Sequence, residues 1–284
     1  MKLSISTNEF LLIRDIIHEK TGIFLAENKK YLIETRLSHL VNESHCKSFT
    51  DYYFKIKEAK RTSPLITDLV DAITTNETLW FRDTHPFSIL EKKIFPELNE
   101  GLQSGENKKI HIWSAACSTG QEPYSIAMLA LELSGRLQFS QTFYEHVKVF
   151  ATDVSTRALS IAESGKFDSI AIGRGLPSYY IDKYFTKEDN AWTISPEVRQ
   201  MIKFKNFNLK EPVAGIMGPF DVIFIRNVMI YFSENFKKEL FRRIESVLKP
   251  SGFLILGTGE SVTSYSERFD MINFEGSICY RLTL

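Results

Sequence analysis

The sequence predicts an α/β protein in which an all-helical N-terminal domain precedes a doubly wound, largely parallel sheet. Residues 1–75 show helical periodicity and contain no glycine-rich loop. Residues 76–284 alternate apolar runs with helical segments, which is the pattern of a largely parallel sheet. Between 109 and 133, a strand, a loop of small residues and a helix follow one another, as they do at nucleotide-type sites of this fold class.

The N-terminal domain (1–75) is expected to contain four helices. The first follows Thr7 and Asn8, which are plausible caps, and ends before Gly22. A second begins near Glu27, and two more cover 49–59 and 65–73. Their apolar positions recur at helical spacing and predict a small bundle: Phe10, Ile13, Ile16 and Ile17 in the first helix, and Ile33, Leu37, Leu40 and Val41 in the second.

The second domain (76–284) contains the predicted strands of the sheet. They cover 109–113, 147–152, 201–206, 220–225, 252–257 and 278–283. A helix over 233–248 ends at the breaker Pro250 and Gly252. Residues 165–200 are less regular and include a hairpin of 184–185 against 192–194, so this segment is predicted to be a small inserted β-subdomain.

Composition and charge exclude several classes of function. The 284 residues carry 35 basic and 35 acidic side chains, which argues against a nucleic-acid binder with a broad basic surface. Cys46, Cys117 and Cys279 are far apart, and the histidines show no metal-binding spacing, so neither disulfides nor a metal are expected. No apolar run reaches the ~18–20 residues of a membrane span, and no signal peptide is recognisable, so a cytoplasmic protein without membrane insertion is expected.

The loop at 114–120 is the strongest indication of a cofactor. Its small residues leave room for a ligand against the backbone and direct the free N–H groups of the following helix toward it. The loop lacks Gly-x-Gly-x-x-Gly and a following Lys-Ser/Thr, which disfavours a dehydrogenase and a P-loop. Glu122 at the helix start would repel phosphates but suits a cation or ribose hydroxyls. S-Adenosylmethionine, with a sulfonium and no phosphate, satisfies both conditions.

Other polar residues follow the predicted strands, and each also has a structural interpretation. Asp153 ends the second strand, where an acid can bind ribose hydroxyls or cap the next helix. Asn208 and Asn227 follow the third and fourth strands, each with an apolar neighbour, Leu209 or Val228. An amide and an apolar side chain suit an adenine ring, although a strand-end asparagine is also a common turn residue.

Several blocks of the chain together resemble the chemotaxis receptor methyltransferases, which esterify glutamate side chains on bacterial chemoreceptors. The blocks are Thr74-Thr-Asn-Glu-Thr-Leu-Trp-Phe-Arg-Asp83, the loop and helix of 113–128, Ala151-Thr-Asp153, Asn208-Leu209 and Phe220-Asp-Val-Ile-Phe-Ile-Arg-Asn-Val-Met-Ile-Tyr-Phe232. They occur in the family's order and span nearly the whole chain. The resemblance implies a Rossmann-like S-adenosylmethionine methyltransferase domain behind an all-α domain.

The resemblance also implies roles for individual residues. Positions that match the family's cofactor contacts are Asn76, Thr78, Arg82, Glu122, Asp153, Asn208, Leu209, Asn227 and Val228. Arg82 and Tyr231 match active-site positions of the family. The alternative interpretations are that Arg82 belongs to an ordinary capped linker and that Tyr231 is a core aromatic residue. The cofactor is S-adenosyl-L-methionine and the product S-adenosyl-L-homocysteine. Gln121 departs from the family, which usually has an acid there.

The implied partner is the cytoplasmic helical region of membrane chemoreceptors. Lys29 and Arg36 lie on the second helix, whose basic residues are implicated in receptor contact, although a solvated helix face explains them equally well. The turn of 187–191 has no glycine and is net negative, so tethering to a receptor's C-terminal pentapeptide is not expected. The alternatives are the same chemistry on a signalling protein outside chemotaxis, or a non-catalytic S-adenosylmethionine sensor. The oligomeric state is not indicated.

Overall fold

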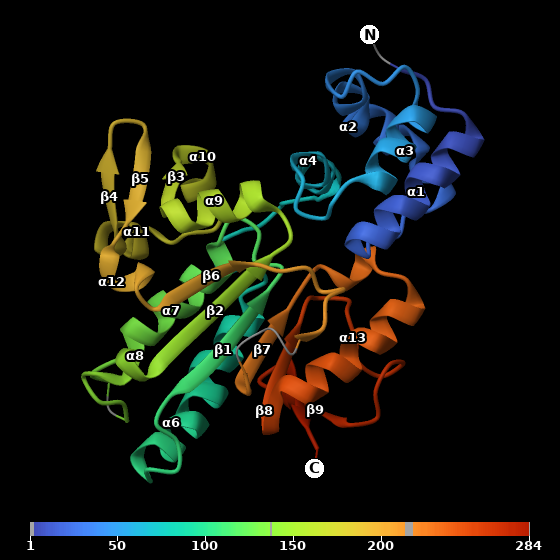
Figure 1. The fold of residues 1–284 in the computed structure, drawn as a ribbon. Coiled ribbons are helices and arrows are strands. Elements are labelled where there is room, and N and C mark those ends of the chain that lie inside the picture. The colour runs from blue at the N-terminus through green and yellow to red at the C-terminus, as the bar shows by residue number, and fades with distance from the viewer. Residues whose placement is uncertain (1–2, 137, 214–217, 284) are drawn as a thin grey trace.

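The computed structural model describes residues 3–136, 138–213 and 218–283 (Figure 1). The helical N-terminal part contains α1 (Thr7–Thr21), the 3₁₀ turn η1 (Glu27–Lys29), α2 (Lys30–Glu43), α3 (Phe49–Glu58) and α4 (Pro64–Ile73). The four predicted helices are therefore confirmed. Their apolar stripes meet in one core, which includes Ile13, Ile17, Leu37 and Val41.

The ends of α1 illustrate how local chemistry sets helix boundaries. Gly22 ends the helix in the left-handed conformation at φ 83°, as predicted. The predicted caps Thr7 and Asn8 are wrong, because the N-cap is Ser6. The hydroxyl of Ser6 accepts a hydrogen bond from the backbone N–H of Glu9 at 3.2 Å, and the Glu9 carboxylate accepts from the Ser6 N–H at 2.9 Å. This reciprocal capping box satisfies two N–H groups that the helix leaves unpaired.

The large sheet has the strand order β6-β2-β1-β7-β8-β10-β9 over the described residues. The strands are β1 (Ile110–Ala115), β2 (Val147–Asp153), β6 (Ile202–Asn206), β7 (Phe220–Ile225), β8 (Leu248–Leu256), β9 (Phe269–Phe274) and β10 (Ser277–Leu282). From β6 to β8 all neighbours are parallel, whereas β10 is antiparallel to both β8 and β9. The largely parallel sheet and its six predicted strands are confirmed. The edge strand β9 is not among the predicted strands.

Helices cover both faces of this sheet, as the doubly wound prediction requires. Alternate residues of β7 face opposite sides: Val222 and Phe224 pack with α7 (Gln121–Leu133), and Ile223 and Ile225 with α13 (Glu234–Val247). Residues 85–103 form a helical stretch that the sequence pattern does not predict. It consists of α5 (His85–Ile89), the π-helical η2 (Leu90–Ile94) and α6 (Phe95–Gln103), and it packs on the α7 side. A short α8 (Phe143–His146) precedes β2.

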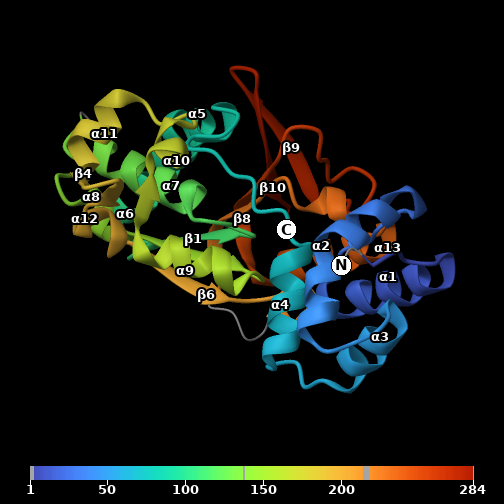
Figure 2. The same ribbon diagram turned by 90° about the horizontal axis from the view of Figure 1, so that it is seen from above.

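The segment between β2 and β6 forms the expected small subdomain. Its elements are α9 (Thr156–Ser164), β3 (Lys166–Asp168), α10 (Ser169–Gly173), α11 (Ser178–Tyr184), β4 (Phe185–Glu188), β5 (Ala191–Ile194) and α12 (Pro196–Arg199). The strands form an antiparallel sheet in the order β3-β5-β4, which confirms the predicted hairpin. This small sheet and the helical part lie on opposite sides of the upper edge of the large sheet, and α9 lies between them (Figures 1 and 2).

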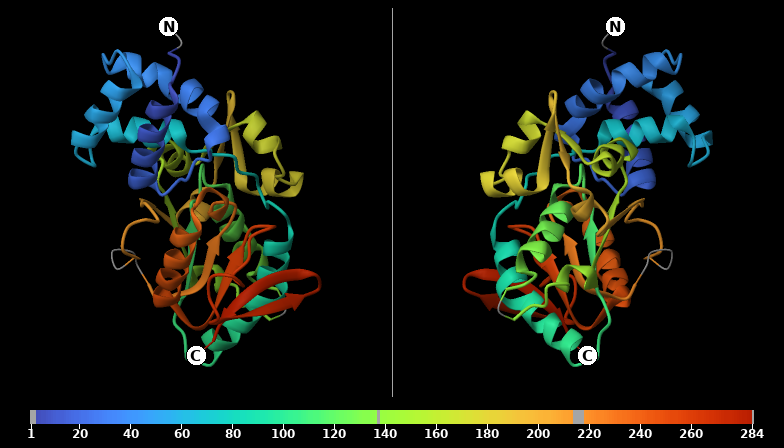
Figure 3. Two further views of the ribbon diagram at one scale, coloured as in Figure 1. Left: turned by 90° about the vertical axis from the view of Figure 1, so that its right-hand side faces the viewer. Right: turned by 90° about the vertical axis from the view of Figure 1, so that its left-hand side faces the viewer.

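The helical part sits above the carboxyl ends of the parallel strands, where the binding sites of such sheets lie (Figures 1 and 3). The segment from Thr74 to Thr84 connects α4 to α5 along this edge. Among the described residues, no helix is both long and apolar enough to cross a bilayer. Residues 3–136, 138–213 and 218–283 contain no group of three or more His, Cys, Asp or Glu side chains that could hold a metal ion.

Candidate cofactor and substrate site

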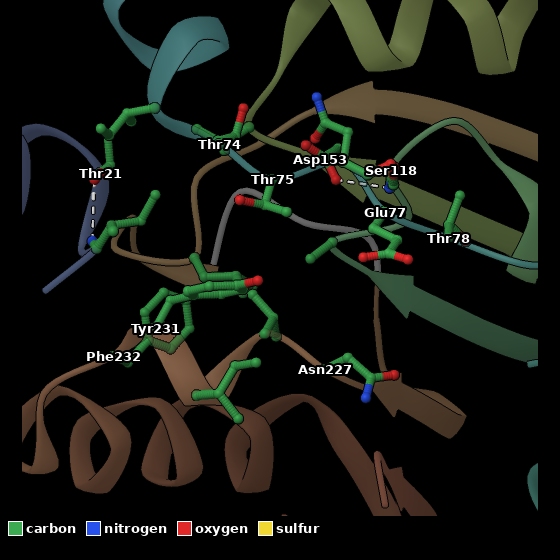
Figure 4. A pocket seen from close by; sticks show the side chains of 18 of the residues that line it. Thr21, Thr74, Thr75, Glu77, Thr78, Ser118, Asp153, Asn227, Tyr231 and Phe232 are labelled. Atoms are coloured by element: carbon green, nitrogen blue, oxygen red, sulfur yellow. Dashed lines mark hydrogen bonds between the residues drawn. The ribbon is translucent and has the colours of Figure 1, made fainter. Parts of the chain in front are cut away.

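A cavity of about 560 Å³ lies between the helical part and the carboxyl edge of the sheet. This volume is within the range of small-molecule sites. Its lining comes from α2 and the loop before it, the 74–82 segment, and the loops after β1, β2, β6 and β7 (Figure 4). Every predicted site residue lines it: Lys29, Arg36, Asn76, Thr78, Arg82, Glu122, Asp153, Asn208, Leu209, Asn227, Val228 and Tyr231. The fold therefore gathers these positions into one site.

The loop between β1 and α7 has an unusual backbone. Ala116, Ser118 and Gly120 all have positive φ, at 57°, 52° and 95°. A β-carbon on Gly120 would lie 2.9 Å from the Cβ of Ala162 on α9, so glycine is required both for its φ and for this close approach. Non-glycine residues with positive φ cost free energy and concentrate at functional sites. The loop thus has the shape of a backbone cradle.

Asp153 joins this cradle to the end of β2. Its side chain accepts hydrogen bonds from the backbone N–H groups of Ser118 at 2.7 Å and Ser155 at 2.8 Å, and Figure 4 shows the first of these. Burial raises the pKa of Asp153 above its ordinary value, against the opposing effect of these hydrogen bonds. The alternative role as cap of α9 is wrong, since the Ser155 hydroxyl caps that helix by accepting from Ala158. Both oxygens of this buried carboxylate thus accept backbone hydrogen bonds at the lining of the cavity.

Glu122, in the first turn of α7, is held from two sides. One carboxylate oxygen accepts from the Ser114 hydroxyl at 2.8 Å, and the other from the Arg226 guanidinium at 2.8 Å. Arg226 also bonds the Asp83 carboxylate at 2.9 Å and the Arg82 carbonyl at 2.8 Å. Its side chain is only 2% exposed. The guanidinium therefore connects α7, the end of β7 and the 74–84 segment.

Arg226 lines the cavity and is not singled out by the sequence analysis. The local indication is a charged residue directly after the buried strand β7, at a strand end where site residues occur. Its Nε is buried without a hydrogen-bond partner, and its guanidinium carbon lies 5.9 Å from the centre of the Phe87 ring. An arginine is buried here because two carboxylates compensate its charge.

The segment that carries Asn76, Thr78 and Arg82 is fastened along its length. The Ser118 hydroxyl donates to the Asn76 carbonyl at 3.0 Å, and the buried Trp80 indole donates to the Ala171 carbonyl at 2.9 Å. The Arg82 guanidinium donates to the carbonyl of Glu77 at 3.2 Å. This bond is to a carbonyl, and no described carboxylate forms an ion pair with Arg82.

Arg36 differs from the expectation of a free docking residue. Its guanidinium donates to the carbonyls of Ile73 at 2.8 Å and Thr74 at 2.9 Å, and to the Thr75 hydroxyl at 3.1 Å. These bonds satisfy carbonyls at the end of α4, as arginines often do at helix C-termini. Lys29 is exposed at the cavity rim. Of the two basic residues, Lys29 is the one whose placement suits contact with another molecule.

The turn that carries Asn227 and Val228 is built around Glu260, another residue missed by sequence reasoning. Its carboxylate accepts from the backbone N–H groups of Asn227 at 2.8 Å, Val228 at 3.1 Å, Met229 at 2.9 Å and Gly257 at 2.9 Å. Asn227 has a positive φ of 56°, which these bonds hold in place. The backbone arrangement, and with it the direction of both side chains, depends on one carboxylate.

Asn208 is placed differently from the expectation of a side chain committed to adenine. Its amide nitrogen donates to the Lys20 carbonyl at 2.7 Å, and its amide oxygen accepts from the Lys210 N–H at 2.9 Å. Lys20 lies in the last turn of α1, so Asn208 ties the helical part to the sheet. Leu209 is buried at 6% exposure in the cavity wall.

Tyr231 lies in the 3₁₀ turn η4 (Met229–Tyr231) and faces the cavity (Figure 4). Its carbonyl accepts from the N–H of Phe24 at 2.7 Å, and Ile23 pairs with Phe232 in an antiparallel bridge. Cys117 is buried in the lining, and burial, followed by the charges of Asp153 and Glu122, raises the pKa of its thiol well above the ordinary value. This direction and the burial of the thiol agree with a packing role for Cys117.

Comparisons with known proteins cover nearly the whole chain. Residues 8–74 match the family model described as "CheR methyltransferase, all-alpha domain", and residues 76–278 match "CheR methyltransferase, SAM binding domain". Chemotaxis protein methyltransferase Cher2 of Pseudomonas putida is 38% identical over 284 residues, covering 98% of this chain and 99% of the relative. Chemotaxis protein methyltransferase 1 of Pseudomonas aeruginosa is 37% identical over 280 residues, with shares of 98% and 99%. A chemotaxis protein methyltransferase of Vibrio parahaemolyticus is 38% identical over 281 residues, with shares of 99% and 98%.

Proposed function

This chain belongs to the CheR methyltransferase family, and we propose that it methylates glutamate side chains of membrane chemoreceptors, giving glutamate methyl esters. It is an S-adenosylmethionine-dependent methyltransferase. The proposed substrate is the cytoplasmic helical region of the receptors, and the proposed location is the cytoplasm. The names of the relatives support a role in chemotaxis.

The lining residues suit S-adenosylmethionine. The cradle requires Gly120 for its close approach to α9, and its surroundings supply the carboxylates of Glu122 and Asp153 for ammonium and hydroxyl groups. Leu209 and Val228 add apolar surface for a flat ring. When bound, the cofactor supplies a methyl group activated by the sulfonium. Asn76, Thr78, Asn208 and Asn227 are proposed as further contacts, with the Asn208 side chain held in place by its hydrogen bond to the Lys20 carbonyl.

The observation that carries the proposal is that Arg82 shares one cavity with Glu122 and Asp153. A guanidinium beside a carboxylate-rich cofactor site provides a position for one further carboxylate, that of the substrate. Arg82 orients this carboxylate, and Tyr231 lines the same space. Arg82 must not hold it so tightly that its nucleophilicity is lost, so its role is to position the substrate.

The chemistry requires little acid–base assistance from the protein. A glutamate side chain, with a pKa near ~4.3, is already ionised at neutral pH and is itself the nucleophile. The leaving group is a neutral thioether, which needs no proton. Consistently, the described lining residues include no histidine. Catalysis then comes from alignment, with the reacting atoms held ~3–3.5 Å apart.

Recognition of a receptor's C-terminal pentapeptide is not part of the proposed function. The hairpin of β4 and β5 turns at Asp189 and Asn190, directly after Lys187 and Glu188 of β4, and contains no glycine. The Lys187 ammonium lies 5.5 Å from the centre of the Trp192 ring. This positive charge beside the turn therefore already contacts an aromatic ring. Titration with such a peptide by calorimetry should show no binding in the micromolar range.

Peptide mass spectrometry tests the proposed function. Membranes of the source organism are incubated with the protein and S-adenosylmethionine, and receptor peptides are sequenced. The proposal expects methyl esters on glutamates of the cytoplasmic helices. Esters confined to proteins outside chemotaxis would transfer the same chemistry to another signalling pathway, and methylation at nitrogen would contradict the proposal.

A further inference from the structure

Three large apolar side chains are exposed around the mouth of the cavity. Phe24 is 50% exposed, Tyr31 59% and Ile230 64%, and all three line the cavity. Phe24 precedes α2 and Tyr31 lies in its first turn, whereas Ile230 belongs to η4. We define these residues as the mouth patch. Exposed apolar side chains that gather at a cavity, contributed by two parts of a chain, are typical of an interaction surface.

Backbone pairing places the mouth patch beside Tyr231. The Phe24 N–H donates to the Tyr231 carbonyl at 2.7 Å, next to the Ile23–Phe232 bridge. Side chains directly opposite each other in an antiparallel pair have Cβ atoms about 4.5–5.5 Å apart. Phe24 therefore lies beside Tyr231, and Ile230 directly precedes Tyr231 in the sequence. A substrate that reaches Tyr231 and Arg82 passes these side chains.

The rim of the mouth also carries charge. Lys29, two residues before Tyr31, is exposed and lines the cavity, and Arg82 lies within it. Arg36 adds positive charge, although its guanidinium is bonded to the end of α4 and the segment that follows. The mouth therefore combines an apolar surface with basic groups, which complements an amphipathic segment that presents an acidic residue.

We propose that the mouth patch binds the apolar side chains one helical turn before and after the target glutamate, in a segment that docks as an intact α-helix. The inference rests on the proposed function and deepens it. Residues three and four positions apart share a helix face, so a glutamate at the edge of an apolar face has apolar neighbours on either side. The helical form follows from the proposed substrate, the cytoplasmic helical region of the receptors; an extended segment would instead present the side chains two positions from the glutamate.

The test compares serine substitutions inside and outside the patch. Phe24→Ser, Tyr31→Ser and Ile230→Ser are made separately. Matched controls are Ile170→Ser on α10, which is 76% exposed, and Met271→Ser on β9, which is 63% exposed; neither residue lines the cavity. Initial rates of base-labile methyl transfer are measured against the concentration of membranes from the source organism, and affinity for S-adenosylmethionine is measured by calorimetry.

Each patch variant should raise the KM for membranes about fivefold to tenfold, as expected for truncated apolar anchors. The affinity of each patch variant for S-adenosylmethionine should stay within about twofold of that of the unchanged protein. Both control variants should match the unchanged protein in KM and in cofactor affinity. A matching loss of cofactor affinity would overturn the inference and place the patch in the cofactor site. An unchanged KM in all three patch variants would overturn it while leaving the proposed function intact. If the unchanged protein forms no base-labile ester, the proposed function fails and the inference falls with it.

Discussion

The Arg226 guanidinium lies 2.8 Å from the carboxylate of Glu122, and this ion pair connects the first residue after β7 to the first turn of α7. The other terminal nitrogen of Arg226 holds Asp83 and the Arg82 carbonyl. The residue proposed to bind the cofactor and the segment proposed to orient the substrate are thus fixed to one buried cation. We infer that Arg226 positions both.

Replacement of Arg226 by methionine should destabilise the protein and weaken cofactor binding. The substitution leaves Glu122 and Asp83 without their cation, and breaking a buried pair in this way costs about 3–5 kcal/mol in the free energy of unfolding. Urea denaturation measures the loss. A change within about 0.5 kcal/mol, as for ordinary surface substitutions, would contradict this account of the ion pair.

Arg226→Lys separates charge from geometry. A lysine ammonium keeps the charge but cannot bridge Glu122, Asp83 and the Arg82 carbonyl with a planar guanidinium. We expect this variant to retain most of the stability while kcat falls, because the segment that carries Arg82 is no longer held. Equal kcat in the lysine variant and the unchanged protein would show that the charge alone is needed.

Arg82→Ala should lower kcat about a hundredfold, because a substrate carboxylate that is no longer oriented loses its alignment with the methyl group. Arg82→Lys should recover part of this loss. Affinity for S-adenosylmethionine, measured by calorimetry, should change much less than kcat. Full turnover of Arg82→Ala with unchanged cofactor affinity would show that Arg82 does not position the substrate.

Cofactor affinity should decrease on acidification at a higher pH than an ordinary aspartate would cause, because burial raises the pKa of Asp153. In the proposed site, protonation would remove acceptor capacity from the carboxylate that is assigned to the ribose hydroxyls. The stability effect has the opposite sign: since the folded pKa is raised, protonation favours the folded state as pH falls through that pKa. Asp153→Asn should remove both dependences, and an unchanged pH profile of affinity in this variant would exclude Asp153.

Glu260→Gln tests whether the turn after β7 depends on one carboxylate. A glutamine side chain replaces one acceptor oxygen with a donor NH₂ group, which cannot accept from the N–H groups of Asn227 and Gly257. We expect cofactor affinity to fall at least tenfold, since two hydrogen bonds to a charged group are lost and each contributes about 1.5–3 kcal/mol. Unchanged affinity by calorimetry would show that Asn227 and Val228 do not need this turn.

Charge reversal at Lys29 and at Arg36 should have different consequences. Lys29→Glu changes an exposed rim charge and should raise the KM for membranes about threefold, with little effect on stability. Arg36→Glu breaks the bonds to Ile73 and Thr74 and should lower stability and cofactor affinity together. Thermal denaturation and calorimetry distinguish the two, and identical effects would refute the separate roles.

The sequence predicts the parts of this molecule that local chemistry determines. Gly120, Glu122 and Asp153 are recognisable because each follows a strand or opens a helix, and the parallel sheet brings such positions to one edge. The helix stop at Gly22 is likewise local, because it depends on a left-handed φ that glycine adopts easily.

What the sequence does not predict depends on contacts between distant residues. Arg226 is 104 positions from Glu122 in the sequence and 143 from Asp83. Asn208 and Lys20 are 188 positions apart. No local pattern encodes these partners, so the internal hydrogen bonds of Asn208 and Arg36 are not predicted, while their cofactor and docking roles stay predictions. The edge strand β9 escapes prediction because its exposed face and its polar residues Asp270 and Asn273 weaken the alternating pattern.

The most direct test of the central claim is the transfer of labelled methyl groups from S-adenosylmethionine to membranes of the source organism, scored as methanol released by base. The account predicts base-labile label with the unchanged protein and its loss with Arg82→Ala, although that variant still binds the cofactor. Absence of label despite measurable cofactor binding would contradict carboxyl methylation of a membrane receptor by this site.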